Sequence, residues 1–335
     1  MIRLLAVLGM LIATSAQGAP YRAPRDAFGA PDLQGVWVNL SITHLQRPKA
    51  FKGLVATPAE AADYEGKARE RYAKGVAPTK ADAPAPDAGA VEDESAQWSG
   101  PPPGLARVRG EIRTSQIVDP ADGRLPFTTA SRAASEKALK DEEVFDDPEM
   151  RPFDERCLLG GGGGVAPPIS NFDLRRIVQT RDSVVIFGEQ NHEARIVRIG
   201  DKHLPAAMAP WMGDSIGWWD GDTLVVETVN LSPNDRWRWN AGDWIPISAG
   251  AKITERFTRV GPAELVYAYT VDDPANYTQP WRGEVPFSIS DKPMLEFSCH
   301  EGNYALTNIL RGARAQEQAQ GQAKAAGKSG AAQRP

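Results

Sequence analysis

The segment Met294–Tyr304 carries the most evident chemical potential in this chain of 335 residues. As a strand, it would place Glu296 and His300 on one face, because alternate side chains of a strand share a face. An imidazole oriented by a carboxylate acts as a general acid or base near neutral pH. If this face lines a cavity, the predicted catalytic residues are His300, Glu296, Glu301 and Tyr304. The alternative is a solvated face that ends in a turn.

A second polar cluster lies between two predicted strands, in the stretch Glu189–Arg195. His192 is a further catalytic candidate, while Glu189 and Arg195 are candidates for binding a ligand. Polar residues are expected at a hairpin turn in any case, so the alternative is a hydrated loop without a function. The two clusters would face each other if the strands close into a barrel.

The second half of the chain holds seven of the nine tryptophans. Residues 232–250 are predicted to form a long loop, in which Trp237 and Trp239 alternate with Arg236 and Arg238. Tryptophan offers a flat apolar surface to a planar ligand, and arginine can hold a carboxylate or stack on a ring. We expect these four residues to bind a ligand. The alternative is that the rings plug the end of the barrel.

The other reactive residue types match no familiar cofactor motif. The histidines have no metal-binding spacing; they are His44, His192, His203 and His300. No Gly-x-Ser-x-Gly occurs, and the run Gly160–Gly164 neither precedes Gly-Lys-Ser/Thr nor opens a helix after a strand. We expect no cofactor and no metal. A zinc ion held by His192, His300 and a carboxylate from separate strands is the alternative.

Composition and charge narrow the classes of partner. The chain is 41% apolar and 24% charged, which is ordinary for globular proteins, and its formal net charge is −5. Nucleic acids and anionic membrane surfaces favour a basic footprint, so neither is expected as a partner. Beyond the N-terminus, no apolar stretch approaches the length needed to span a bilayer. The sequence leaves the oligomeric state open.

The N-terminus has the layout of a secretory signal peptide. Arg3 supplies a positive charge, residues 4–13 an apolar core, and Ala16 and Gly18 a small-x-small cleavage site. We expect residues 1–18 to be removed and the mature protein to be periplasmic or secreted. A buried N-terminal helix is the alternative.

The two cysteines, Cys157 and Cys299, fit an exported protein. An even number of cysteines in an oxidising compartment favours a disulfide bond, so we predict that these two pair. Two separate buried thiols are the alternative.

From residue 171 the chain consists of runs rich in Val, Ile, Phe, Tyr and Thr, separated by short turns. The predicted strands are Leu174–Thr180, Ser183–Gln190, Ala194–Ile199, Thr223–Leu231, Lys252–Val260, Glu264–Val271, Gly283–Ile289 and Met294–His300. Strands without intervening helices predict a mainly β fold, and closure into an antiparallel up-and-down barrel over 171–314 removes exposed edges. An open sheet or a sandwich is the alternative.

The rest of the chain is predicted to be less regular. Residues 19–170 should add a strand near Leu33–Val38 and a long, partly helical and partly disordered insertion packed on the barrel. A helix within 45–75 is indicated by Thr57 as N-cap. Residues 315–335 have almost no large apolar side chain, which predicts a disordered tail.

Several motifs resemble known proteins. Gly35-Val36-Trp37 resembles the Gly-x-Trp of a lipocalin first strand. A larger set resembles the blocks of a large, mostly uncharacterised family of exported bacterial proteins. Those blocks are Arg113–Pro126 (RTSQIVDPADGRLP), Ile177–Thr180, Gly217–Val226 (GWWDGDTLVV), Glu255–Arg259 (ERFTR) and Cys299–Tyr304 (CHEGNY). The resemblance implies export and a lipocalin- or calycin-like barrel, but supplies no catalytic residues. The segment around Asp146–Glu149 and the glycine run depart from the family pattern.

Three functions follow from these observations. The first is an exported barrel acting on a small hydrophobic, aromatic molecule by cofactor-free acid–base chemistry of the lyase or isomerase type, by analogy with exported lyases of lignin-like compounds. The second is a non-catalytic carrier or sensor of the lipocalin type. The third is an envelope scaffold, which would expose a large apolar patch.

Overall fold

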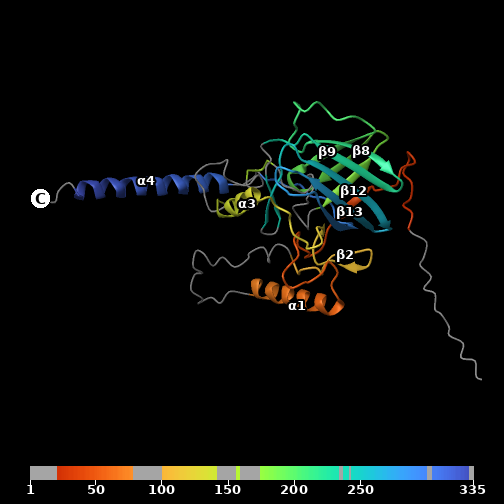
Figure 1. The fold of residues 1–335 in the computed structure, drawn as a ribbon, viewed down its shortest axis with the longest axis horizontal. Coiled ribbons are helices and arrows are strands. Elements are labelled where there is room, and N and C mark those ends of the chain that lie inside the picture. The colour runs from red at the N-terminus through yellow and green to blue at the C-terminus, as the bar shows by residue number, and fades with distance from the viewer. Residues whose placement is uncertain are drawn as a thin grey trace, which may run out of the picture.

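The structure is a computed structural model that describes residues 21–77, 100–141, 156–158, 174–233, 237–240, 243–299 and 304–331. Within these residues, nine strands close into a barrel in the order β1-β5-β6-β7-β8-β9-β12-β13-β14, and β14 returns to β1 (Figure 1). The nine are β1 (Gly35–Val38), β5 (Arg175–Gln179), β6 (Ser183–Gly188), β7 (Ala194–Ile199), β8 (Asp214–Asp220), β9 (Thr223–Val229), β12 (Lys252–Gly261), β13 (Glu264–Asp272) and β14 (Trp281–Ile289). The prediction of a mainly β barrel is confirmed.

The inner face of the barrel is set by the two-residue period of its strands. In β5, Arg175, Ile177 and Gln179 are buried while the residues between them are exposed. The apolar inward residues of the barrel, including Val197 and Leu265, belong to one continuous hydrophobic core. Two predicted hairpin turns are present, because β8 pairs with β9 and β12 pairs with β13. At Gly221 a φ of 61° suits the tight β8–β9 turn.

The barrel is mixed rather than purely antiparallel, which corrects the predicted topology. Strands β7 and β8 run parallel, with Arg198 opposite Ile216. Residues 200–213 connect them, and a parallel pair needs a connection of about this length or longer to bring the chain back to the same end. The sequence pattern shows strand-forming runs but does not fix the direction of each neighbour.

The predicted strand Met294–His300 was wrong, because residues 290–299 contain no strand. The reason lies in β14, whose two edges are already occupied. One edge pairs with β13, and the other pairs with β4 (Ile117–Asp119) near Arg282 and with β1 near Ile289. The barrel is therefore complete before residue 290, and no free edge remains for another strand.

Residues 21–34 cover the end of the barrel that carries the β5–β6, β8–β9 and β12–β13 turns. Arg25 forms a salt bridge of 2.7 Å with Asp222 in the β8–β9 turn. At the same end, Gln179 at the end of β5 accepts a hydrogen bond from the Leu33 N–H and donates one to Asp26. Leu33 is fully buried, so this segment closes that end with an apolar plug.

The opposite end of the barrel is covered by a hairpin that is not part of the barrel itself. The sequence predicted a long loop over these residues, 232–250. Strands β10 (Trp237–Asn240) and β11 (Asp243–Pro246) pair with each other, and α3 (Thr129–Asp141) packs against β11. Ile245 of β11 is fully buried in the barrel core, and the Tyr277 hydroxyl donates to the Pro246 carbonyl oxygen at 2.9 Å. Side chains from this hairpin thus extend the core at that end.

A smaller unit lies beside the barrel (Figure 1). It contains α1 (Pro58–Gly75) and the hairpin of β2 (Arg107–Val108) with β3 (Glu111–Ile112), around a separate apolar cluster that includes Phe51 and Leu105. The predicted capping box is present: the Glu60 N–H donates to the Thr57 hydroxyl, and the Thr57 N–H donates to the Glu60 carboxylate. The helix predicted within 45–75 is confirmed.

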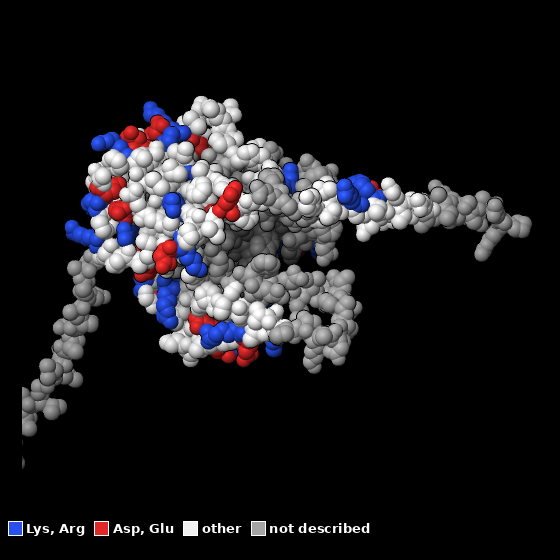
Figure 2. Space-filling view, turned by 180° about the vertical axis from the view of Figure 1, so that it is seen from behind, with Lys and Arg blue, Asp and Glu red and all other residues white. Residues whose placement is uncertain are grey.

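Helix α4 (Ala305–Ala331) occupies most of the segment predicted to be a disordered tail. Its abundant alanine favours a helix, and most of the helix extends away from the barrel in Figure 1. Among the described residues, no helix has the length and apolar character that a bilayer crossing requires. Basic and acidic side chains are interspersed over the barrel face shown in Figure 2. Arg256 and Asp220 form an exposed salt bridge of 2.6 Å.

Candidate functional site

The residues predicted to be catalytic lie at the surface or outside the described part of the chain. His300 and Glu301 fall outside it. Glu296 is exposed, and Tyr304 is 70% exposed. His192, which ends the short 3₁₀ helix η2, is exposed as well. Glu296, Tyr304 and His192 therefore do not line the barrel interior.

The structure does join the two segments that were expected to face each other. The Leu295 N–H donates a hydrogen bond of 2.7 Å to the Glu189 carboxylate, which links the 294–299 segment to the turn after β6. Cys157 and Cys299 form a disulfide bond, so the predicted pairing is confirmed. The disulfide anchors the end of the same segment to a region that is 142 residues away in the sequence.

The tryptophan- and arginine-rich stretch lies in and beside β10. Trp237 is half-buried at the start of that strand. Arg238 and Trp239 belong to β10 by their backbone, while their side chains and all of Arg236 lie outside the described part. The ligand-binding roles of these four residues remain predictions.

Arg195 is inside the barrel rather than in the hydrated turn where the sequence placed it. It alternates along β7 with the exposed Ala194 and Ile196, and it is only 3% exposed. Its guanidinium makes a two-pronged contact with the carboxylate of Glu255 from β12, with Nη2 at 2.9 Å from Oε1 and Nη1 bonded to Oε2. A charge pair thus crosses the interior between β7 and β12.

Tyr267 of β13 completes this interior network. Its hydroxyl donates to Oε1 of Glu255 at 2.7 Å, so the fully buried carboxylate accepts from both Arg195 and Tyr267. Burial alone would lower the pKa of Arg195, but the adjacent Glu255 carboxylate outweighs it and raises the pKa. Burial, together with Glu255, raises the pKa of Tyr267 well above its ordinary value. Both shifts favour a protonated guanidinium at Arg195 and a neutral phenol at Tyr267.

Tyr269 lies two residues further along β13 and differs from Tyr267 in its hydrogen bonding. It is 2% exposed, and its hydroxyl has no hydrogen-bond partner among the described residues. Burial raises the pKa of this phenol far above its ordinary range. The Nε of Arg195 is a second buried donor without a partner in the described structure. Unpaired buried polar atoms are few in native proteins and call for an explanation.

Aromatic rings surround these polar groups. Tyr267 packs against Phe257, Tyr269 and Phe287, with ring centroids 4.8, 5.5 and 5.6 Å away. Tyr269 also meets the edge of Trp281, at 5.7 Å and 84° between the ring planes. The interior is thus an aromatic environment that contains a few placed polar groups, the composition typical of small-molecule sites.

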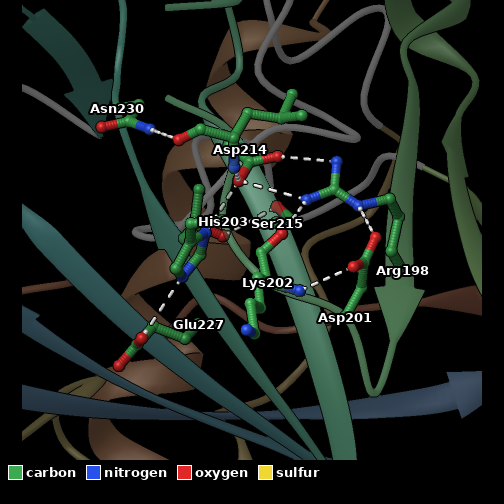
Figure 3. Close-up of polar contacts among 10 residues, drawn as sticks. Arg198, Asp201, Lys202, His203, Asp214, Ser215, Glu227 and Asn230 are labelled. Atoms are coloured by element: carbon green, nitrogen blue, oxygen red, sulfur yellow. Dashed lines mark hydrogen bonds and ion pairs between the residues drawn. The ribbon is translucent and has the colours of Figure 1, made fainter. Parts of the chain in front are cut away.

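A different polar cluster lies on the outer wall of the barrel, beneath the β7–β8 connection (Figure 3). The Nδ1 of His203 is 2.8 Å from Oδ2 of Asp214, and its Nε2 is 3.3 Å from Oε1 of Glu227. Arg198 pairs with Oδ1 of Asp214 at 3.0 Å, and the Leu204 N–H donates to its Oδ2 at 2.8 Å. The sequence analysis did not identify this cluster, because its residues come from four parts of the fold: β7, the β7–β8 connection, β8 and β9.

Strand register explains why this cluster faces outward. Ser215 and Thr228 are opposed inward residues joined by a 2.8 Å hydrogen bond, so their neighbours Asp214 and Glu227 point to the outer face. Burial would raise the pKa of Asp214, but hydrogen bonds from the Leu204 N–H, His203 and Arg198 outweigh it and lower the pKa. The described residues contain no group of histidine, cysteine or acidic side chains that could hold a metal ion. The cluster serves to fasten the parallel connection to the wall.

Glu255 was within reach of sequence reasoning. In β12 it alternates with Ile253 and Phe257, which are both buried, so the strand period by itself indicates an inward carboxylate. Its partner Arg195 could not be found in this way, because pairing across the barrel interior leaves no trace in local spacing.

No model of a protein family matches the chain, and no curated protein matches it.

Proposed function

We propose that this protein is an exported barrel that binds a small aromatic molecule in its interior, as a carrier or sensor. The observation that carries the proposal is the pair of unpartnered donors, the Tyr269 hydroxyl and the Arg195 Nε, buried among aromatic rings. Leaving a buried donor unpaired costs about 1–3 kcal/mol, a cost that a bound ligand removes.

The surrounding rings favour a planar ligand. Trp281, Phe287 and Tyr267 are each less than 5% exposed. Tyr267 contacts Phe287 directly, and Tyr269 lies between Tyr267 and Trp281 and contacts both. Aromatic pairs prefer edge-to-face or offset contacts at about 4.5–7 Å, and a planar aromatic ligand would make contacts of the same kind with these rings.

The route of entry follows from the two ends of the barrel. Residues 21–34 hold one end through the Arg25–Asp222 salt bridge and the hydrogen bonds of Gln179. The other end is covered by the β10–β11 hairpin, which carries Trp237, one of the residues that the sequence predicts to bind a ligand. We infer that the ligand enters past this hairpin.

Export is supported by two independent features. Residues 1–18 have the layout of a signal peptide, and the Cys157–Cys299 disulfide is of the kind that persists in oxidising compartments.

A titration with a panel of aromatic metabolites tests the binding proposal, with tryptophan fluorescence and thermal stability as readouts. The buried Trp281 should report the ligand, whereas Trp218, 42% exposed on the outer wall, should not. Binding should therefore change the emission of wild type and Trp218→Phe but much less that of Trp281→Phe. A panel that leaves both fluorescence and thermal stability unchanged would refute the proposal.

The acid–base reaction predicted from the sequence is a second proposal, favoured by the hydrogen bond from Leu295 to Glu189. This bond holds the segment that leads to His300 beside the turn that carries His192. If the protein is a lyase or isomerase, His300→Ala and His192→Ala should abolish turnover of an aromatic substrate and leave the fold intact. Undiminished turnover in both variants would remove these histidines from the mechanism.

A further inference from the structure

We infer that the barrel ligand is an uncharged aromatic carbonyl compound, such as an aryl ketone, aldehyde or ester, whose oxygen accepts a hydrogen bond from the Tyr269 hydroxyl. This inference rests on the proposed binding function and adds the chemical class of the ligand.

The first step asks whether the atom that would pair with the Tyr269 hydroxyl is a hydrogen-bond donor or an acceptor. The Tyr267 hydroxyl already donates to Glu255, and the Tyr277 hydroxyl already donates to the Pro246 carbonyl. Of these three core tyrosines, only Tyr269 has a hydroxyl without a partner in the described structure. Arg195 Nε, another atom of the interior network without a hydrogen-bond partner in the described structure, is also a donor. Both groups would be satisfied by one kind of ligand atom, an acceptor.

The charge of that acceptor is the second step. Arg195 is the cation of the network, and Glu255 already neutralises it through two hydrogen bonds. The carboxylate of Glu193, which is 6% exposed, also helps to raise the pKa of Arg195. A carboxylate ligand would bring a further negative charge beside Glu255 and Glu193 in a low-dielectric interior, where the other inward guanidinium near these rings, that of Arg175, lies 5.0 Å from the Phe287 ring. A neutral carbonyl oxygen satisfies the donors without that cost.

The position of Tyr269 is the third step. Its phenol end lies over Gly283 of β14, where a side-chain Cβ would meet the ring Cζ at 2.2 Å and the hydroxyl oxygen at 2.3 Å. Trp281 stands edge-on to the same ring. The ring is thus held by packing, and the position of its hydroxyl oxygen is set before a ligand arrives, which is the arrangement that selects a ligand by one placed oxygen.

Three probes of similar size separate the effect of the hydrogen bond from the effect of charge. Acetophenone carries a neutral acceptor, ethylbenzene has none, and benzoate is charged. Their affinities should be measured by calorimetry on the mature, disulfide-bonded protein. The variants are Tyr269→Phe and, as a matched control with an occupied hydroxyl, Tyr277→Phe. For wild type we expect acetophenone to bind most tightly and benzoate least. Tyr269→Phe should weaken acetophenone about tenfold, the equivalent of one buried hydrogen bond, and leave ethylbenzene unchanged.

The outcomes distinguish this inference from the proposed function. Equal binding of acetophenone and ethylbenzene, with no effect of Tyr269→Phe, would overturn the carbonyl assignment while the aromatic barrel stands. Tightest binding of benzoate would overturn the charge argument. If the three probes and the wider aromatic panel all fail to bind, the binding function itself is wrong. Tyr277→Phe should keep the wild-type order of affinities, because its hydroxyl is not offered to a ligand.

Discussion

The phenol of Tyr269 lies over Gly283 on the adjacent strand, in space that any side chain at position 283 would occupy. The two residues are directly opposed in the β13–β14 pair. A Cβ added to Gly283 would come within 2.2 Å of the tyrosine ring, far inside van der Waals contact. The glycine is thus required by the tyrosine rather than by a turn, and the contact sets where the unpartnered hydroxyl lies.

Gly283→Ala should destabilise the protein by about 1–3 kcal/mol, the usual range for overpacking a core. The measurement is the free energy of unfolding from urea denaturation. Replacing Tyr269 with leucine in the same chain should relieve the clash, so Gly283→Ala should cost much less in that background. Additive effects of the two substitutions would show that the clash is absorbed elsewhere.

Tyr267→Phe and Tyr269→Phe should differ in their effect on stability, although both remove one buried hydroxyl from neighbouring positions of one strand. The Tyr267 hydroxyl donates to a buried carboxylate, so its loss should cost about 1.5–3 kcal/mol. The Tyr269 hydroxyl has no partner in the described structure, so its loss should leave the ligand-free stability unchanged or higher. Thermal and urea denaturation of the two variants give the comparison, and equal destabilisation would contradict it.

Glu255→Gln should destabilise the barrel strongly, by about 3–5 kcal/mol, because it leaves the buried Arg195 charge without its counter-ion. The double variant Arg195→Met with Glu255→Leu should recover much of that loss, since it removes both charges and keeps apolar volume in the core. Urea denaturation of wild type, single and double variants forms the test. A double variant as unstable as the single one would show that the ion pair is needed for the fold itself.

The outer cluster predicts a loss of stability in acid. The pKa of Asp214 is lower in the folded chain than its ordinary value of 3.8, so the unfolded chain takes up the proton first as the pH falls. The stability that Asp214 contributes is therefore complete above about pH 5 and is lost as the pH falls through the lowered folded value. Asp214→Asn should be less stable than wild type near neutral pH and should approach it near pH 2.

Urea denaturation across this pH range measures the difference between the two proteins. Asp222→Asn is a suitable control, because Asp222 makes an exposed pair with Arg25 that should contribute little. A constant gap between wild type and Asp214→Asn from neutral pH to acid would contradict the assignment.

Replacing both Cys157 and Cys299 with serine should lower stability by about 4–5 kcal/mol, because the bond closes a loop spanning 142 residues. Denaturation of the oxidised wild type, the reduced wild type and the double variant is the measurement. The reduced protein and the variant should unfold at the same, lower urea concentration. A reduced protein as stable as the oxidised one would show that the bond adds nothing to the folded barrel.

The sequence was sufficient where the signal is local. Alternation along β12 indicates that Glu255 faces inward with Ile253 and Phe257, and the two hairpin turns follow from their own residues. Thr57 marks the start of α1 because a capping box is complete within four consecutive positions. The predicted pairing of Cys157 with Cys299 needed only their number and an exported chain.

The tertiary structure decided everything that depends on partners distant in the sequence. The run at 294–299 has the alternation of a strand, but β1 and β4 already occupy the available edge of β14, so it has nothing to pair with. Arg195 reads as a polar turn residue until Glu255 is seen across the barrel. Local periodicity reports the face on which a side chain lies. Only closure of the barrel decides which side chains meet inside it, because those contacts join strands whose separation in the chain carries no pattern.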